Sequence, residues 1–218
     1  MTDVERDVAF TLADLSGYVA LTEAHGSREA AGVIDRYLAV ADAARMPAAR
    51  LVERAGDQLV FAADAPRDAV LTALRLREAV AREPMFPRVR AGVHQGRVLE
   101  RDGAYYGAAL NVAARVVDRA APGQVLCTET VAHAARGLPG VTVQPLGPVA
   151  LRHLAEPLAL FEITAPAGAA VVIDPVCQMQ LTPASAVASA SHEGIVRYFC
   201  SEPCAAAFAR RPDAYAAR

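Results

Sequence analysis

An amide and a guanidinium four residues apart are the most chemically informative side chains of this sequence. Asn111 and Arg115 lie in a segment with helical periodicity, and their spacing places both on one face of the helix. The apolar positions of this segment follow the i, i+3, i+4, i+7 rule of a core-facing stripe, and they are Leu110, Ala113, Ala114 and Val117. Asp14 and Asp57 stand upstream, each at a turn signal. Two carboxylates, an amide and an arginine suit a site that handles a nucleoside triphosphate with metal ions.

A second set of reactive side chains lies near the C-terminus. Cys177, Cys200 and Cys204 have the spacing C-x22-C-x3-C, whereas Cys127 stands alone in a strand pattern that places it in the core. Pro203 predicts a helix start beside Cys200 and Cys204, so that both sulfurs share a face near the positive helix end, which favours thiolate. Cys177 is expected on a separate strand. Clustered cysteines in a cytosolic chain are more often metal ligands or redox groups than a disulfide framework.

The three clustered thiolates limit the kind of ion that could bind. They can hold Zn²⁺ together with a fourth ligand, or Cu⁺ in lower coordination. The sequence leaves Asp174, His192 and water open as the fourth ligand. The alternative is that the cysteines pack as small hydrophobic side chains. A unit of about 45 residues buries little core of its own, which favours a bound metal.

Charge composition and hydropathy limit the partners of this chain. All 22 basic residues are arginines, so any role that commonly falls to lysine is absent or met by arginine. The formal net charge is −2 and no basic block occurs, which argues against nucleic acid as a partner. No apolar run reaches the roughly 18 residues of a membrane span. The acidic segment Met1–Asp7 lacks the apolar core of a signal peptide, so we expect a cytoplasmic protein with no membrane partner.

Hydrophobic periodicity predicts an alternation of strands and helices. Helices are expected at 18–24, 28–44, 68–82 and 107–120. Strands are expected at 8–13, 51–54, 59–62, 89–94, 97–100, 124–127, 141–145 and 158–163. Two hairpins are predicted, one around Gly56–Asp57 and one around Gln95–Gly96. The order βαββαβ with extra strands predicts an α+β fold in which helices cover a sheet.

Five ordered segments resemble the motifs of class III nucleotide cyclases (adenylate and guanylate cyclases). They are Leu12–Tyr18, Gly56–Asp57, Ala91–Val98, Tyr106–Arg115 and Gly147–Arg152. The resemblance covers roughly residues 6–164 and implies a ferredoxin-like βαββαβ cyclase fold. It also implies attack of the ribose 3′-oxygen on the α-phosphate of ATP or GTP, which expels pyrophosphate and yields the 3′,5′-cyclic nucleotide.

The resemblance implies a role for each matching side chain. Asp14 and Asp57 match the two metal-binding aspartates, which hold two Mg²⁺ or Mn²⁺ ions per site. Gly17 permits a tight turn whose N–H groups face a phosphate. Asn111 matches the residue that orients the ribose, and Arg115 matches the one that stabilises charge on the transferring phosphate. Taken singly, Asp57 could be a turn former and Arg115 a solvated arginine; the agreement of the whole set favours function.

Other positions of the resemblance bear on phosphate and base recognition. Arg97 and Arg152 match positions that often carry a basic residue for the outer phosphates. Glu53 stands where adenylate cyclases usually carry lysine, and a carboxylate there can accept from guanine. Ala104 replaces the second base-reading residue and offers no side-chain hydrogen bond, so ATP and GTP both stay open. His94 is expected to make a structural hydrogen bond rather than act as a base.

In this family the metal aspartates and the asparagine–arginine pair come from opposite subunits. The resemblance therefore implies a head-to-tail homodimer with two composite sites. Arg115 also has an ordinary alternative as the ion-pair partner of Asp118 or Glu129 on a solvated helix face.

The C-terminal segment resembles the YHS domain, a small module related to metal-binding domains of the TRASH type. The matching segments are Asp174–Met179, Tyr198–Cys204, Phe208 and Pro212–Tyr215. Gln178 stands where the family commonly has glycine. We expect a catalytic domain at 1–164, a linker at 165–173 and a metal-binding domain at 174–218.

Three functions are compatible with these patterns. The first is an active nucleotide cyclase adjusted by a soft metal at the C-terminal domain. The second is a catalytically weak cyclase-fold dimer that acts as a nucleotide-binding or metal-responsive regulatory protein. The third is a metal chaperone in which the cyclase-like part serves as a dimerisation scaffold.

Overall fold

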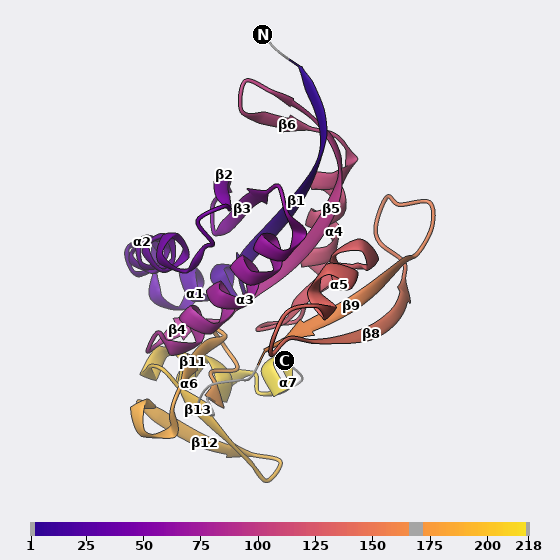
Figure 1. Ribbon diagram of the computed structural model, residues 1–218. Helices are drawn as coiled ribbons and strands as arrows, with labels where there is room; N and C mark the ends of the chain where they lie inside the picture. Colours follow the sequence, from indigo (N-terminus) through magenta and orange to yellow (C-terminus); the bar gives the residue numbers. More distant parts are fainter. Residues whose placement is uncertain (1–2, 166–171, 217–218) are drawn as a thin grey trace.

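A computed structural model describes residues 3–165 and 172–216 of the chain (Figure 1). The helices are α1 (Tyr18–His25), α2 (Ser27–Ala44), α3 (Pro66–Arg82), α4 (Ala108–Arg119), α5 (Glu129–Arg136), α6 (Glu202–Arg210) and α7 (Asp213–Ala216). The longer strands are β1 (Val4–Leu15), β2 (Arg50–Ala55), β3 (Gln58–Ala63), β5 (Val89–Arg101), β7 (Val125–Thr128), β8 (Thr142–Val149), β9 (Leu158–Thr164), β12 (Ala188–His192) and β13 (Ile195–Phe199). Shorter strands are β4 (Phe86–Pro87), β6 (Ala104–Tyr106), β10 (Val172–Ile173) and β11 (Met179–Leu181).

One large sheet forms the frame of the molecule. Its order is β2-β3-β1-β5-β7-β9-β8, and β6 pairs with β5. The part β2-β3-β1-β5 is antiparallel throughout and arises from a βαββαβ succession, so the predicted α+β fold is confirmed. Strand β7 adds parallel to β5, and β9 and β8 extend the sheet antiparallel. Among the described helices, none has the length and apolar character that a membrane crossing requires.

Strand β1 presents two different faces because its side chains alternate. Ala9 and Ala13 belong to the core beneath α2, α3 and α5. Phe10 and Leu12 face the other way, into a second core that α4 covers. Helix α4 is thereby held on the opposite side of the sheet from α2 and α3.

Small residues allow α4 to lie directly on the sheet. A Cβ added at Gly96 would meet the Cβ of Ala109 at 3.0 Å, and one at Gly92 would collide with the backbone of Val117. The stripe Ala109, Ala113 and Val117 thus rests on glycines of β5. Gly96 serves close packing here, and the predicted hairpin around Gln95–Gly96 is wrong.

Several element boundaries differ from the sequence prediction. Residues 89–101 form one strand, and the chain reverses at Asp102 and Gly103, which have φ values of 49° and 80°. Strand β1 continues through Leu15, so Asp14 lies inside the strand, one residue before its end. Helix α5 was not predicted. Cys177 lies in a turn between β10 and β11 rather than on a strand.

The C-terminal segment packs against the frame rather than standing apart. Strand β11 pairs with β4, with Met179 opposite Pro87 and Gln180 opposite Phe86. The Gln180 side-chain amide also donates to the Val80 carbonyl at the end of α3. Buried Val176 and Met179 join the same apolar cluster as Leu21 of α1. Most of the predicted linker falls on 166–171, outside the described residues, so the domain limits stay a prediction.

Candidate functional site

Two carboxyl groups from separate elements meet at the end of β1. Asp14 lies near the end of that strand, and Asp57 lies in the turn between β2 and β3. Burial, together with a hydrogen bond to the Asp14 carboxyl, raises the pKa of Asp57 to about 7. A proton shared by two adjacent carboxylates is the natural substitute for a cation. The pair therefore fits a divalent metal, which would displace that proton.

The surroundings of this pair add a cation and a buried hydroxyl. Arg90, the cross-strand neighbour of Asp14, donates to Asp14 Oδ2 from Nε at 3.0 Å and from Nη2 at 2.5 Å. Tyr37 is fully buried in α2, and burial together with the charges of Asp14 and Asp57 raises the pKa of its phenol. Within the described part of the chain, the Tyr37 hydroxyl has no hydrogen-bond partner. A buried hydroxyl without a partner, close to two carboxyl groups, is a second indication, after the shared proton, that the site binds a metal or another polar ligand.

Asn111 and Arg115 lie on the outer side of α4. Each is two residues from buried Ala113, which is about 200° around a helix with 3.6 residues per turn. Arg115 Nη1 donates to Asp118 Oδ2 at 3.2 Å, which is one of the two surface ion pairs that the sequence left open as an alternative. Since the buried stripe of α4 faces β1 and β5, both side chains point away from the sheet of their own chain. One chain brings Asp14 and Asp57 together but leaves Asn111 and Arg115 apart from them.

The remaining predicted site residues are spread over exposed positions. Arg97 is exposed and lies 3.5 Å from the Glu5 carboxylate, and Arg152 is exposed in the turn before β9. Glu53 on β2 and Ala104 on β6 are exposed as well. Gly17 precedes α1 with φ +79°, as the predicted tight turn requires. No described hydrogen bond or ion pair joins Arg97, Arg152 or Glu53 to the carboxyl pair of the same chain.

His94 has the structural role expected of it. Its Nδ1 lies 2.8 Å from the Thr128 hydroxyl, which joins β5 to the end of β7. Burial lowers the pKa of His94 to about 4, so the ring is neutral at physiological pH. Cys127 on β7 is also a core residue as predicted, and burial raises the pKa of its thiol to about 12.

A second site brings four metal-binding side chains together. Cys177, Cys200 and Cys204 are buried, and His25 at the end of α1 faces them. All four ligand atoms lie within 4.8 Å of one another. Sγ of Cys200 is 3.4 Å from Sγ of Cys177 and 3.8 Å from Sγ of Cys204. Nε2 of His25 is 3.5 Å from Sγ of Cys200 and 3.7 Å from Sγ of Cys204.

These distances are close to the edges of a metal-centred tetrahedron, with the Cys177–Cys200 distance the shortest. Bonds of about 2.3 Å to sulfur and about 2.05 Å to nitrogen give edges of roughly 3.8 Å between sulfurs and 3.5 Å between sulfur and nitrogen. Hydrogen bonds from the Cys177 and Cys200 thiols lower the pKa of Cys204, because both thiols can donate to the Cys204 thiolate and stabilise it. The cluster is therefore spaced for a four-coordinate ion and already favours one thiolate.

The local fold explains how the cysteines converge. Cys200 precedes α6, and Ser201 caps that helix by accepting from the N–H of Cys204 at 3.3 Å. Asp174, fully buried, accepts from the N–H of Val176 and of Cys200, each at 2.8 Å. One carboxylate thus ties the turn that carries Cys177 to the segment that carries Cys200.

Two of the three candidates for the fourth ligand, Asp174 and His192, lie outside the cluster, where His25 stands instead. Both Asp174 oxygens are occupied by backbone N–H groups, and His192 packs on Phe208 with Nε2 3.6 Å from Asp213. His25 was missed because it precedes Cys177 by about 150 residues, and no local pattern connects the two. A histidine at the end of a short helix carries no such signal by itself.

Comparison with protein families identifies the C-terminal segment. Residues 172–218 match the family model described as YHS domain. This agrees with the predicted resemblance and places the three clustered cysteines inside the matched region.

Curated relatives match the other part of the chain. The adenylate cyclase of Glutamicibacter nicotianae is 32% identical over 167 residues, which cover 76% of this chain and 41% of that protein. A pH-sensitive adenylate cyclase of Mycobacterium tuberculosis (strain CDC 1551 / Oshkosh) is 32% identical over 161 residues, or 72% of this chain and 41% of that protein. The chain thus spans about two fifths of the length of these relatives.

Solved structures share the fold of the large sheet. An adenylate cyclase from Trypanosoma brucei, solved in its monomeric state, has a TM-score of 0.67 at 22% identity and covers 73% of this chain and 88% of that chain. The guanylate cyclase domain from Catenaria anguillulae, in complex with GTP, has a TM-score of 0.61 at 18% identity and covers 76% and 99%. The large sheet and its helices therefore have the same fold as these cyclase domains.

Proposed function

Because the chain joins a domain of the class III cyclase fold to a YHS domain, we propose that it is a nucleotide cyclase. It converts ATP or GTP to the 3′,5′-cyclic nucleotide and pyrophosphate. The observation that carries the proposal is the pair of carboxyl groups at the end of β1, where Asp14 and Asp57 are hydrogen-bonded to each other. Relatives described as adenylate cyclases support it.

The proposed chemistry assigns one task to each group. Asp14 and Asp57 would hold Mg²⁺ or Mn²⁺, and such ions promote ionisation of the ribose 3′-hydroxyl and neutralise the triphosphate. Asn111 orients the ribose, and Arg115 donates to the oxygens of the α-phosphate as negative charge develops there. Arg115 is prepared for this task because its present partner, Asp118, is an exposed carboxylate that a phosphate can displace. Arg97 and Arg152 are assigned to the outer phosphates.

The proposal requires a homodimer. Asn111 and Arg115 point away from the sheet that carries Asp14 and Asp57, so a second chain must present them to the carboxyl pair. A two-fold related dimer would build two such composite sites. The cytoplasmic location stays a prediction.

A complementation assay tests both the chemistry and the dimer. Purified chain with Mn²⁺ should form cyclic nucleotide from ATP or GTP, and Asp57→Ala or Arg115→Ala should each abolish the product. An equal mixture of the two variants should recover about a quarter of the wild-type rate, because half of the dimers are mixed and each carries one intact site. Arg119→Ala, which removes an exposed arginine one turn later on α4, is the matched control and should keep full activity.

Two results would contradict the proposal in different ways. Absence of product from both nucleotides would end the cyclase assignment. Failure of the mixture to recover activity, with an active wild-type protein, would show that the site is not shared between chains. Running ATP and GTP side by side also determines the base preference that Glu53 and Ala104 leave open.

A second candidate function is a dimer that binds nucleotide without turnover. The observation that favours it is the ion pair of Asp14 with Arg90, which occupies a carboxylate oxygen that a metal would need. Calorimetric binding of ATP or GTP to a protein that forms no product would support this alternative.

A further inference from the structure

We propose that His25, Cys177, Cys200 and Cys204 form a single zinc site that ties the YHS domain to helix α1 and holds the Gly17 turn at the other end of that helix. The metal site stands on the geometry alone. Its effect on catalysis rests on the proposed cyclase function.

The site is incomplete in either domain by itself. The YHS domain supplies three sulfurs, and the cyclase domain supplies one imidazole from the last residue of α1. Four ligands at tetrahedral spacing favour Zn²⁺, whereas three thiolates without His25 would suit Cu⁺. The metal that the site prefers therefore depends on whether the two domains are docked, because docking supplies the fourth ligand.

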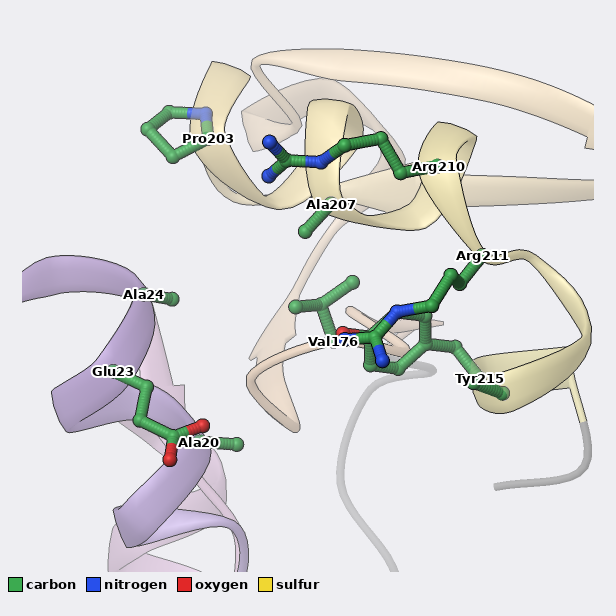
Figure 2. A pocket seen from close by; sticks show the side chains of 10 residues that line it. Ala20, Glu23, Ala24, Val176, Pro203, Ala207, Arg210, Arg211 and Tyr215 are labelled. Atoms are coloured by element: carbon green, nitrogen blue, oxygen red, sulfur yellow. The ribbon is translucent and has the colours of Figure 1, made fainter.

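Helix α1 is fixed only in part by buried packing, in which Tyr18 and Ala24 lie half-buried against the main apolar cluster. Leu21 is its one buried residue, and all eight residues of α1 are described. Part of the side of α1 that faces α6 borders a cavity of about 540 Å³ (Figure 2). Figure 2 shows Ala20, Glu23 and Ala24 on one side of this cavity, with Pro203 and Ala207 on the other. A metal bond at His25 would therefore strengthen a contact between two helices that pack on each other only in part.

The other end of α1 contacts the same turn of the YHS domain. A Cβ added at Gly17 would lie 2.7 Å from the Cβ of Gln178 and 3.0 Å from the carbonyl oxygen of Cys177. Cys177 thus touches the start of α1 with its carbonyl and the end of α1 with its thiol, through the cluster with Cys200 and His25. A metal held by Cys177 and His25 would clamp both ends of the helix onto one turn.

This clamp reaches the proposed catalytic site through a short stretch of chain. Gly17 lies three residues after Asp14, and Ser16 between them donates its N–H to the Arg88 carbonyl at 2.8 Å. Fixing α1 fixes the turn assigned to the phosphates and the strand end that carries Asp14. The zinc-loaded protein is therefore the more active form, and loss of zinc lowers the turnover number.

The binding experiment uses the 218-residue chain and variants in which a metal-ligand residue is substituted. Zinc content should be one ion per chain beyond the catalytic metals, and Co²⁺ in its place should give thiolate charge-transfer bands with a tetrahedral spectrum. His25→Ala should weaken zinc binding by at least about tenfold, since it removes a direct ligand. His25→Cys should retain tight binding with the spectrum of a four-sulfur site. His133→Ala, an exposed histidine of α5, is the matched control and should behave as wild type.

Hydrogen exchange then measures the clamp without any catalytic readout. Zinc should slow exchange of the α1 amides in the wild-type and His25→Cys proteins, and should leave them unchanged in His25→Ala. Equal affinity, spectrum and α1 exchange in His25→Ala and wild type would overturn the proposal, since the YHS domain would then hold the ion alone.

Cyclase rates give the final comparison. A chelator selective for zinc over magnesium should lower the rate of wild type and of His133→Ala, whereas His25→Ala should be slow with or without zinc. An active enzyme whose cyclase rate does not change with zinc would overturn the proposed effect of the zinc site on catalysis. If no variant forms product, the cyclase assignment fails, and the spectra and exchange data still decide the metal site.

Discussion

Replacing Gly17 with alanine tests whether the YHS domain docks on the α1 turn. Gly17 has φ +79°, a left-handed conformation that costs an alanine roughly 1–2 kcal/mol. The added methyl would also meet the Cβ and Cγ of Gln178 at 2.7 and 2.8 Å, well inside van der Waals contact. Overpacking of this kind costs about 1–3 kcal/mol, so the sum is about 2–5 kcal/mol of unfolding free energy.

Gly103 provides a matched control for the backbone part of this cost. Its φ is +80°, and an added Cβ would meet nothing within 4 Å. Gly103→Ala should therefore lose only the roughly 1–2 kcal/mol of the left-handed conformation. The difference between the two variants measures the contact with the YHS domain.

Urea unfolding of the zinc-saturated protein is the assay, and a double-mutant cycle isolates the contact. Gln178→Gly removes the two carbon atoms that the new methyl would meet, and its own φ of 64° suits glycine. In that background the cost of Gly17→Ala should fall toward the Gly103→Ala value. An equal cost of Gly17→Ala in both backgrounds would refute the docking of Gln178 on Gly17.

Three further predictions address other features of the fold. His94, whose pKa burial lowers to about 4, binds no proton when folded at pH 5, while an unfolded histidine with a pKa of about 6.5 does. Stability should therefore fall as the pH drops from 6.5 toward 4, by on the order of 2–3 kcal/mol, and His94→Gln should lose this part of the acid sensitivity in urea titrations between pH 4 and 7. Asp174→Asn should cost about 2–4 kcal/mol and reduce zinc affinity by about 10–100-fold, because the carboxylate that joins the Cys177 turn to Cys200 loses an acceptor; unchanged affinity in a chelator competition would contradict this. Arg115→Ala should change the unfolding free energy by less than about 1 kcal/mol while abolishing product, because its ion pair with Asp118 is solvent-exposed; a large loss of stability would assign Arg115 a structural role.

Local patterns were sufficient for most of the frame. The alternation of β1 and the stripe of α4 follow from periods of two and 3.6, and these periods decide which side chains are buried. The hairpin around Gln95–Gly96 was wrong because glycine signals a turn and also close packing, and only the presence of α4 above β5 distinguishes the two.

The candidate sites divide in the same way. Asp14, Asp57, Asn111, Arg115 and the three clustered cysteines could be chosen from residue type, spacing and the resemblance to cyclase and YHS motifs. The contacts of Asp14 with Arg90 and of His25 with Cys200 could not, because they join residues that are 76 and 175 positions apart. Contacts at this sequence separation depend on how helices and strands pack on one another. Local residue spacing does not encode that packing.

Residue types and motifs were enough to predict the chemistry that the chain carries: carboxylates for a hard cation, an amide and an arginine for a nucleotide, and three thiolates for a soft metal. How these groups are arranged in space followed only from the packing of the helices on the sheet. The tertiary structure turned Asn111 and Arg115 away from their own carboxyl pair, because α4 buries its opposite side on β5. It also placed His25 beside the thiols, because β11 pairs with β4 and carries the YHS domain onto both ends of α1.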